Sequence, residues 1–249
     1  MYLCFTFMAT TFLKARWENL IMANYSIDPK ILLPFLPAGL ELDTYNGKTF
    51  VSLVGFLFRD SKIFNIPIPF MGTFEEVNLR FYVKRKTSEG YRRGVVFISE
   101  TVPYKPVAWL ANKLYKEHYI AIPTKHHLDV NTDIKTVKYE WKVNENWNSI
   151  LVKSKIESRQ MQQGSLEEFI FEHYYGYTKL SDEESQEYRV NHPRWMVHDV
   201  IEETIQCDFS QMYGHSFGSL NHQMPDSVII AEGSEISVDW KRIKFNCNF

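Results

Sequence analysis

Residues 74–83, with the sequence FEEVNLRFYV, carry the pattern that decides the fold. Apolar and polar residues alternate along this stretch, and a β-strand points successive side chains to opposite faces of its sheet. The apolar face consists of Val77, Leu79, Phe81 and Val83. The polar face places an acid, an amide, a guanidinium and a phenol in a row, which are Glu76, Asn78, Arg80 and Tyr82. The pattern therefore predicts a β-strand with reactive or binding groups on one of its two faces.

The direction of the polar face admits two interpretations. If it faces water, the strand is an ordinary half-buried strand. If it faces the interior of a barrel, its groups can pair with one another and hold a small polar molecule, with Arg80 binding a carboxylate through two hydrogen bonds. Arg16 and Glu100 are further polar residues within apolar, strand-like sequence, and they favour the second interpretation. The expected ligand-binding residues are Asn78, Arg80, Tyr82, Glu100 and Arg16.

Most of the remaining chain also has strand and turn patterns. Asn46-Gly47 predicts a hairpin between residues 40–45 and 49–59, because both central residues of such a turn take positive φ. Glu89-Gly90 predicts the turn that follows the strand quoted above. Further strands are expected over residues 12–27, 93–101, 119–123, 134–143, 150–157, 171–178, 188–195, 200–208 and 236–245.

Helices are expected to be few and short. Residues 106–116 give the best helical pattern, and Ser165 stands three residues before Glu168, which is the spacing of a capping box. Many strands in succession without a βαβ alternation predict an α+β fold that is mainly antiparallel, or barrel-like. No linker or repeat divides the chain, so a single domain over residues 1–249 is expected, with residues 1–11 as a frayed or mis-assigned start.

Charge and cysteine content exclude several classes of function. The chain has 249 residues with 28 Lys+Arg against 30 Asp+Glu, so its net charge of −2 offers no general attraction to nucleic acid or to anionic membranes. Three scattered cysteines form neither a disulfide framework nor a metal-binding pair, which indicates the cytoplasm. The eight histidines show no metal-ligand spacing, and no cofactor motif is present, so neither a metal nor a cofactor is expected.

Several short motifs together resemble the YqjF-like family of uncharacterised proteins. The resemblance rests on Glu76-x-Asn78-x-Arg80-x-Tyr82-Val83, on Trp17, on the helix start at Asp28-Pro29, and on Leu36-Pro37 and Leu42-Asp43. It covers residues 12–123 in order, with weaker similarity at residues 172–174 and 192–195. Such proteins are similar in fold to acetoacetate decarboxylase, and the resemblance implies a closed, largely antiparallel β cone or barrel around a central cavity.

The same resemblance implies candidate catalytic residues. Acetoacetate decarboxylase forms a Schiff base between a lysine and a β-keto acid, and an adjacent cationic group keeps the amine of that lysine nucleophilic at neutral pH. In this chain Lys116 is the lysine near the expected region, and Glu76 is the matching proton donor or acceptor. No Lys-Lys pair occurs anywhere in the chain. Lys116 also fits a solvated position at a helix C-terminus, where a cation interacts favourably with the helix dipole.

Three functions remain open from the sequence. The first is an internal cavity that binds an acidic or carbonyl-bearing small molecule. The second is a decarboxylase-like enzyme in which Lys116 forms the Schiff base and Glu76 carries the proton. The third is a structural protein that forms a homo-oligomer through Tyr174, Tyr175 and Trp195.

Overall fold

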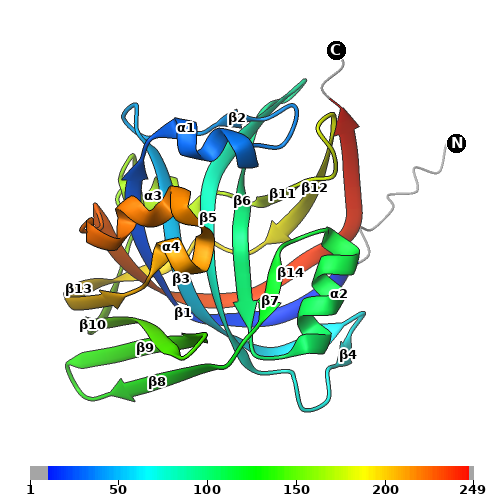
Figure 1. The fold of residues 1–249 in the computed structure, drawn as a ribbon. Helices are drawn as coiled ribbons and strands as arrows, with labels where there is room; N and C mark the ends of the chain where they lie inside the picture. The colour runs from blue at the N-terminus through cyan, green and yellow to red at the C-terminus, as the bar shows by residue number, and fades with distance from the viewer. Residues whose placement is uncertain (1–10, 247–249) are drawn as a thin grey trace, which may run out of the picture.

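Long antiparallel strands dominate the computed structural model, which describes residues 11–246 (Figure 1). Seven strands follow one another around a ring in the order β1, β3, β5, β6, β11, β12 and β14. Their bounds are β1 (Thr11–Ile27), β3 (Thr49–Ile63), β5 (Phe74–Thr87), β6 (Gly90–Val102), β11 (Tyr175–Lys179), β12 (Glu184–Asn191) and β14 (Ser227–Asn246). Pairing between β1 and β14 closes the ring. Only β6 and β11 are parallel neighbours within it.

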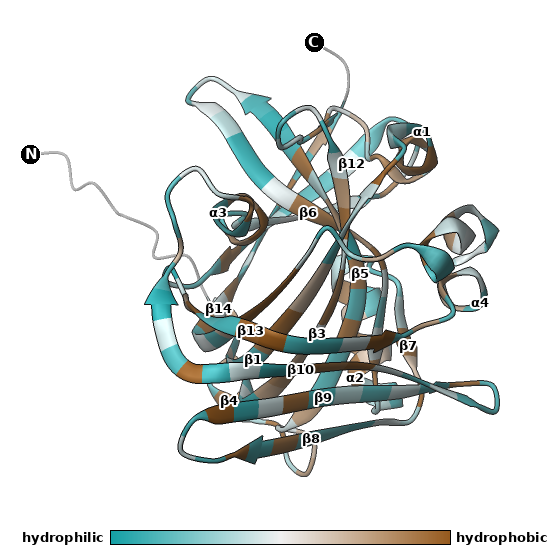
Figure 2. Cartoon of the chain, turned by 90° about the vertical axis from the view of Figure 1, so that its left-hand side faces the viewer, coloured by the Kyte–Doolittle hydropathy of each residue, from teal (hydrophilic) through white to brown (hydrophobic). Residues whose placement is uncertain are grey.

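A second group of strands branches from the ring at β14 and continues in the order β13, β10, β9, β8. These strands are β13 (Met196–Gln206), β10 (Asn146–Gln160), β9 (Ile134–Val143) and β8 (Thr124–Val130). Figure 2 shows them side by side across the ring strands. Gly55 of β3 permits this layer to pack closely, because a Cβ atom there would lie 2.8 Å from the ring of Tyr139 on β9.

Short elements fill the connections between the long strands. They are β2 (Glu41–Leu42), β4 (Ile66–Pro67), β7 (Tyr119–Ala121), the helices α1 (Pro29–Leu32), α2 (Lys105–Tyr115), α3 (Leu166–Phe171) and α4 (Phe209–Tyr213), and the 3₁₀ helices η1 (Leu33–Phe35) and η2 (His215–His222). Ser165 caps α3 by accepting a hydrogen bond from the Glu168 amide, so the predicted capping box is confirmed. No helix within residues 11–246 is both long and apolar enough to cross a membrane.

Two apolar clusters occupy the two faces of the ring strands. Val77, Leu79, Phe81 and Val83 of β5 belong to the outer cluster, together with residues of β9 and β10. The opposite face of β5 turns inward, where Tyr82 packs in the inner cluster with residues of β1, β14 and α2. The alternation predicted for residues 74–83 is therefore confirmed, and its polar face lies inside the ring.

The predictions for the fold class are confirmed, with local exceptions. Asn46 and Gly47 take φ of 50° and 77° as expected, but the hairpin contains only the bridge between Tyr45 and Lys48. The strand before this turn is reduced to β2, which pairs with β5 and not with β3. The expected frayed start over residues 1–11 lies almost wholly outside the described residues, and Thr11 already belongs to β1.

Candidate functional site

An internal cavity of about 140 Å³ lies inside the ring, between the ring strands and the inner side of α2. Its wall is mainly apolar, with polar side chains contributed by Ser61, Glu76, Asn78, Arg80, Glu100, Glu117, Tyr119 and Tyr188. A dry protein cavity of roughly 150 Å³ can hold a molecule the size of benzene. The cavity therefore has room for a ligand of about six or seven non-hydrogen atoms.

Strands β5 and β6 bring the first polar residues together. Asn78 lies directly opposite Glu100 in the antiparallel pair, and Glu76 follows on the same face of β5. Asn78 Nδ2 donates a hydrogen bond of 2.9 Å to Glu76 Oε1, and the Tyr119 hydroxyl donates one of 3.1 Å to Glu76 Oε2. Glu76, Asn78 and Glu100 are only 1–3% exposed.

The turn after α2 places a third carboxyl group in the cavity. Lys116 ends the helix in the left-handed conformation, with φ of 60°. The chain reversal exposes Lys116 to solvent and turns Glu117 inward, where Glu117 is 7% exposed. Asn112 holds this turn by bonding both the amide and the carbonyl of Tyr119. Glu117 Oε1 accepts hydrogen bonds from the Tyr188 hydroxyl at 2.7 Å and the Thr178 hydroxyl at 3.1 Å.

Burial favours the protonated forms of these three carboxyl groups. It raises the pKa of Glu76 to about 7 and the pKa of Glu117 to about 8. The pKa of Glu100 is also raised, by burial and by the nearby charges of Glu117 and Glu76. The cavity therefore holds carboxyl groups that can donate or accept protons near neutral pH.

Arg80 is the one cation among the described residues that line the cavity. Its Nη2 atom lies 3.5 Å from Met22 Sδ, and its Nε atom is buried without a hydrogen-bond partner. Asn78 Oδ1 and Glu100 Oε2 are likewise buried without partners. Unpaired buried polar atoms are rare in folded proteins and costly, so these three atoms are suited to receive polar groups of a bound molecule.

The other residues expected at the site lie elsewhere. The Tyr82 hydroxyl is hydrogen-bonded to Ser52 Oγ, and its ring packs on His173 and Phe169, outside the cavity wall. Arg16 points away from the cavity and pairs with Glu18 on the surface. Lys116 is exposed and does not line the cavity, because the left-handed turn directs the next residue inward instead. The structure brings together Glu76, Asn78, Arg80 and Glu100.

Three cavity residues, Glu117, Tyr119 and Tyr188, were not expected from the sequence. Glu117 directly follows the predicted end of the helix at Lys116. Its position at the start of the chain reversal was the one sequence feature that could have indicated it as a cavity residue. Tyr188 reaches the cavity through the ring order β6, β11, β12, which no short-range pattern specifies. Residues 11–246 contain no group of three or more His, Cys, Asp or Glu side chains that could hold a metal ion.

A closed ring of mainly antiparallel strands around an acid-lined cavity defines a protein of the acetoacetate decarboxylase-like fold. An acetoacetate decarboxylase-like enzyme from Sphingomonas wittichii RW1 superposes with a TM-score of 0.64 at 11% identity, over 95% of this chain and 94% of that one. Acetoacetate decarboxylase from Legionella pneumophila gives 0.61 at 12% identity, over 93% and 88% of the two chains. The enduracididine biosynthesis enzyme MppR complexed with pyruvate gives 0.62 at 12% identity, over 96% and 93%. At such identities these similarities establish the fold alone.

The chain belongs to the DUF2071 family, described as "Uncharacterized conserved protein", whose profile matches residues 14–235. Uncharacterized protein YqjF of Bacillus subtilis (strain 168) is 35% identical over 79 residues, which are 31% of this chain. The match spans about a third of the length of that relative. The resemblance inferred from the sequence motifs is confirmed.

Proposed function

We propose that the protein binds a short-chain acid carrying a carbonyl group, such as a keto acid of three or four carbons, in the internal cavity. The observation that carries this proposal is the buried Nε atom of Arg80, which has no partner within the protein. A guanidinium recognises a carboxylate through paired, charge-assisted hydrogen bonds. The cavity volume of about 140 Å³ limits such a ligand to a few carbon atoms.

The buried carboxyl groups are suited to recognise the carbonyl group of the same ligand. A protonated Glu76 or Glu100 can donate a hydrogen bond to a ligand carbonyl, while an ionised carboxylate can only accept one. Because burial raises the pKa of Glu76 to about 7, its donor form is present at and below neutral pH. One structural neighbour of this fold is complexed with pyruvate, which is a ligand of the proposed size and chemistry.

Schiff-base decarboxylation has less support than binding. That chemistry requires a lysine amine at the ligand, and no described residue that lines the cavity is a lysine. Lys116 is exposed beyond the turn that brings Glu117 inward. Borohydride reduction in the presence of acetoacetate is expected to leave every lysine unmodified, and an adduct on any lysine would restore the decarboxylase alternative.

The binding proposal is tested by calorimetric titration with pyruvate and acetoacetate and with their methyl esters. We expect the acids to bind and the esters to bind at least tenfold more weakly, because the esters lack the charge that Arg80 recognises. Arg80→Gln is expected to abolish binding. Arg194→Gln is the matched control, because Arg194 forms a surface ion pair with Glu168 and does not line the cavity. Equal binding by the two variants would refute the role of Arg80.

Partners and location complete the proposal. We propose a cytoplasmic protein, in agreement with the free thiol of Cys207, the one cysteine within the described residues. A homo-oligomer formed through Tyr174, Tyr175 and Trp195 has little support, because Trp195 is only 5% exposed and packs inside the protein. Light scattering over a range of concentrations measures the oligomeric state directly.

A further inference from the structure

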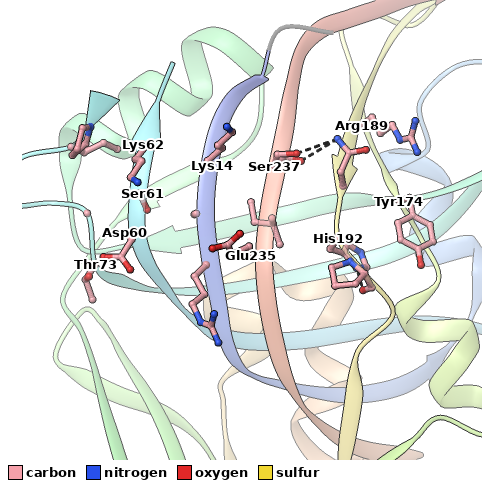
Figure 3. Close-up of a pocket in the computed structure, with 18 of the residues that line it drawn as sticks. Lys14, Asp60, Ser61, Lys62, Thr73, Tyr174, Arg189, His192, Glu235 and Ser237 are labelled. Atoms are coloured by element: carbon pink, nitrogen blue, oxygen red, sulfur yellow. Dashed lines mark hydrogen bonds between the residues drawn. The ribbon is translucent and has the colours of Figure 1, made fainter. Parts of the chain in front are cut away.

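A broad groove of about 1340 Å³ crosses β3, β1, β14 and β12 on the surface of the protein (Figure 3). In the figure Asp60, Ser61, Lys62 and Thr73 lie along one side, Lys14 and Glu235 in the middle, and Tyr174, Arg189 and His192 along the other side. The basic side chains lining the groove outnumber the acidic ones, with Lys14, Arg16, Lys62 and Arg189 against Asp60 and Glu235.

The charges in this groove are compensated unevenly. Lys14 lies directly opposite Lys62 on adjacent strands, and Arg16 lies opposite Arg59. Like charges in such positions repel each other. The arginine pair shares the carboxylate of Glu18, at 2.8 Å from Arg16 Nε and 2.7 Å from Arg59 Nε. No salt bridge within residues 11–246 involves Lys14 or Lys62. The lysine pair is therefore available to an external anion.

The groove and the internal cavity meet at two residues, Ser61 and Ile68, which line both. Residues 64–72 form a strap over this boundary. The strap is attached to β3 by hydrogen bonds of 3.1 Å from the Ile68 amide to the Ser61 carbonyl and from the Ser61 amide to the Gly72 carbonyl. Ser61 Oγ is buried at the same boundary without a partner. Ser61 and the strap residue Ile68 thus lie between the two spaces.

Three residues of the strap have positive φ, two of them in the turn between β3 and β4. Phe64, Asn65 and Phe70 have φ of 48°, 65° and 61°, in the left-handed region that residues with a side chain rarely adopt. Strand β4 within the strap pairs with β3 over two residues only, and the Phe70 side chain is fully exposed. Phe64 anchors the start of the strap, because its amide donates a hydrogen bond to the Phe12 carbonyl and its ring packs on Phe12 and Trp240. Residues 66–70 are mostly exposed, so a movement away from the boundary is expected in this part of the strap.

We propose that the groove is the access route by which an acidic ligand reaches the internal cavity. Lys14 and Lys62 attract the anion, and it passes Ser61 when Ile68 and the strap move aside. The proposal rests on the proposed function for the nature of the ligand. The route itself is a property of the free protein and is testable without any ligand.

A cysteine placed in the cavity reports access directly. Val54 is fully buried, lines the cavity and is close in size to cysteine, so Val54→Cys serves as the reporter. Its modification is followed by mass spectrometry with two methanethiosulfonates of similar size, one carrying a sulfonate and the other a trimethylammonium group. We expect Lys14→Gln/Lys62→Gln to slow the anionic reagent about fivefold relative to the cationic one at low ionic strength. The difference should disappear near 1 M salt, where the Debye length is about 3 Å.

Two matched controls accompany this measurement. Lys153→Gln/Lys155→Gln changes the net charge equally on β10, away from the groove, and is expected to leave the ratio of the two rates unchanged. Ile68→Ala is expected to speed both reagents, whereas Ile66→Ala in the same strap is expected to change neither, because Ile66 is 70% exposed and lines neither space. Leu110→Cys on α2 replaces the reporter if Val54→Cys does not fold.

Rates that are insensitive to both the lysine pair and Ile68 would overturn the access route. This outcome is independent of the titrations with keto acids. A protein that binds no acid but shows the expected labelling would refute the proposed function alone, and a protein that binds acids through Arg80 but shows no such labelling would refute the route alone.

Discussion

Replacement of Glu117 by glutamine is expected to remove the decrease in the free energy of unfolding that Glu117 causes between pH 5 and pH 8. Burial raises the pKa of Glu117 from 4.5 to about 8 in the folded chain, so the folded chain holds a proton that the unfolded chain releases. Its contribution to stability is therefore fully present below about pH 4.5 and is lost as the pH rises to about 8. One pKa unit corresponds to 1.36 kcal/mol, so the loss between pH 5 and pH 8 is about 3–4 kcal/mol.

Glu117→Gln imitates the protonated side chain, because the amide oxygen can still accept the hydrogen bonds of Tyr188 and Thr178. Urea unfolding at pH 5, 6, 7 and 8 measures the free energy of unfolding of both proteins. The decline with pH should be smaller in the variant by about 3–4 kcal/mol. Glu145→Gln is the control, since the Glu145 side chain is 92% exposed and should leave the decline unchanged. Parallel curves for the wild type and Glu117→Gln would refute the buried, protonated carboxyl group.

Three further substitutions test other parts of the structure. Burial opposes the ionisation of Asp43, but hydrogen bonds with His173 and Arg93 lower its pKa to about 2. Asp43→Asn should therefore lower the free energy of unfolding by about 2 kcal/mol at pH 7. In acid unfolding this difference between wild type and variant should shrink as the pH falls from about 4 to 2. Gly55→Ala should cost about 1–3 kcal/mol in urea unfolding, because its Cβ would collide with Tyr139, and no loss would contradict the close packing of β9 on β3. Asn112→Ala removes both hydrogen bonds to the Tyr119 backbone and should cost about 2 kcal/mol, with faster hydrogen exchange at Tyr119 as its specific signature.

Short-range patterns predicted the parts of the fold that depend on neighbouring residues. The alternation over residues 74–83, the turn at Gly90 and the helix before Lys116 are all confirmed. The strand expected over residues 171–178 was wrong at its start, because Phe171 ends helix α3 and β11 begins only at Tyr175. The strand expected over residues 188–195 ends at Asn191, two residues before Pro193.

The residues of the candidate site also fall into two groups, those that short-range patterns predict and those that depend on tertiary structure. Glu76, Asn78, Arg80 and Glu100 could be predicted together, because alternation and one hairpin are sufficient to place them on one face. Arg16 lies beside Trp17, which faces the cavity, so alternation directs Arg16 to the opposite face. Glu117 and Tyr188 depend on a left-handed turn and on distant strand pairing, and both are set by tertiary structure.

Closure of the ring also has a consequence for how the protein is made. The contact between β1 and β14 joins residues far apart in the chain, as in the hydrogen bond between Asn24 and Ser227, which are 203 positions apart. During synthesis β1 therefore waits with one unpaired edge until β14 leaves the ribosome. Unpaired strand edges attract other strands, and contacts of such separation form slowly. Newly made chains should be most prone to aggregate, and most dependent on chaperones, in the interval before this last strand arrives.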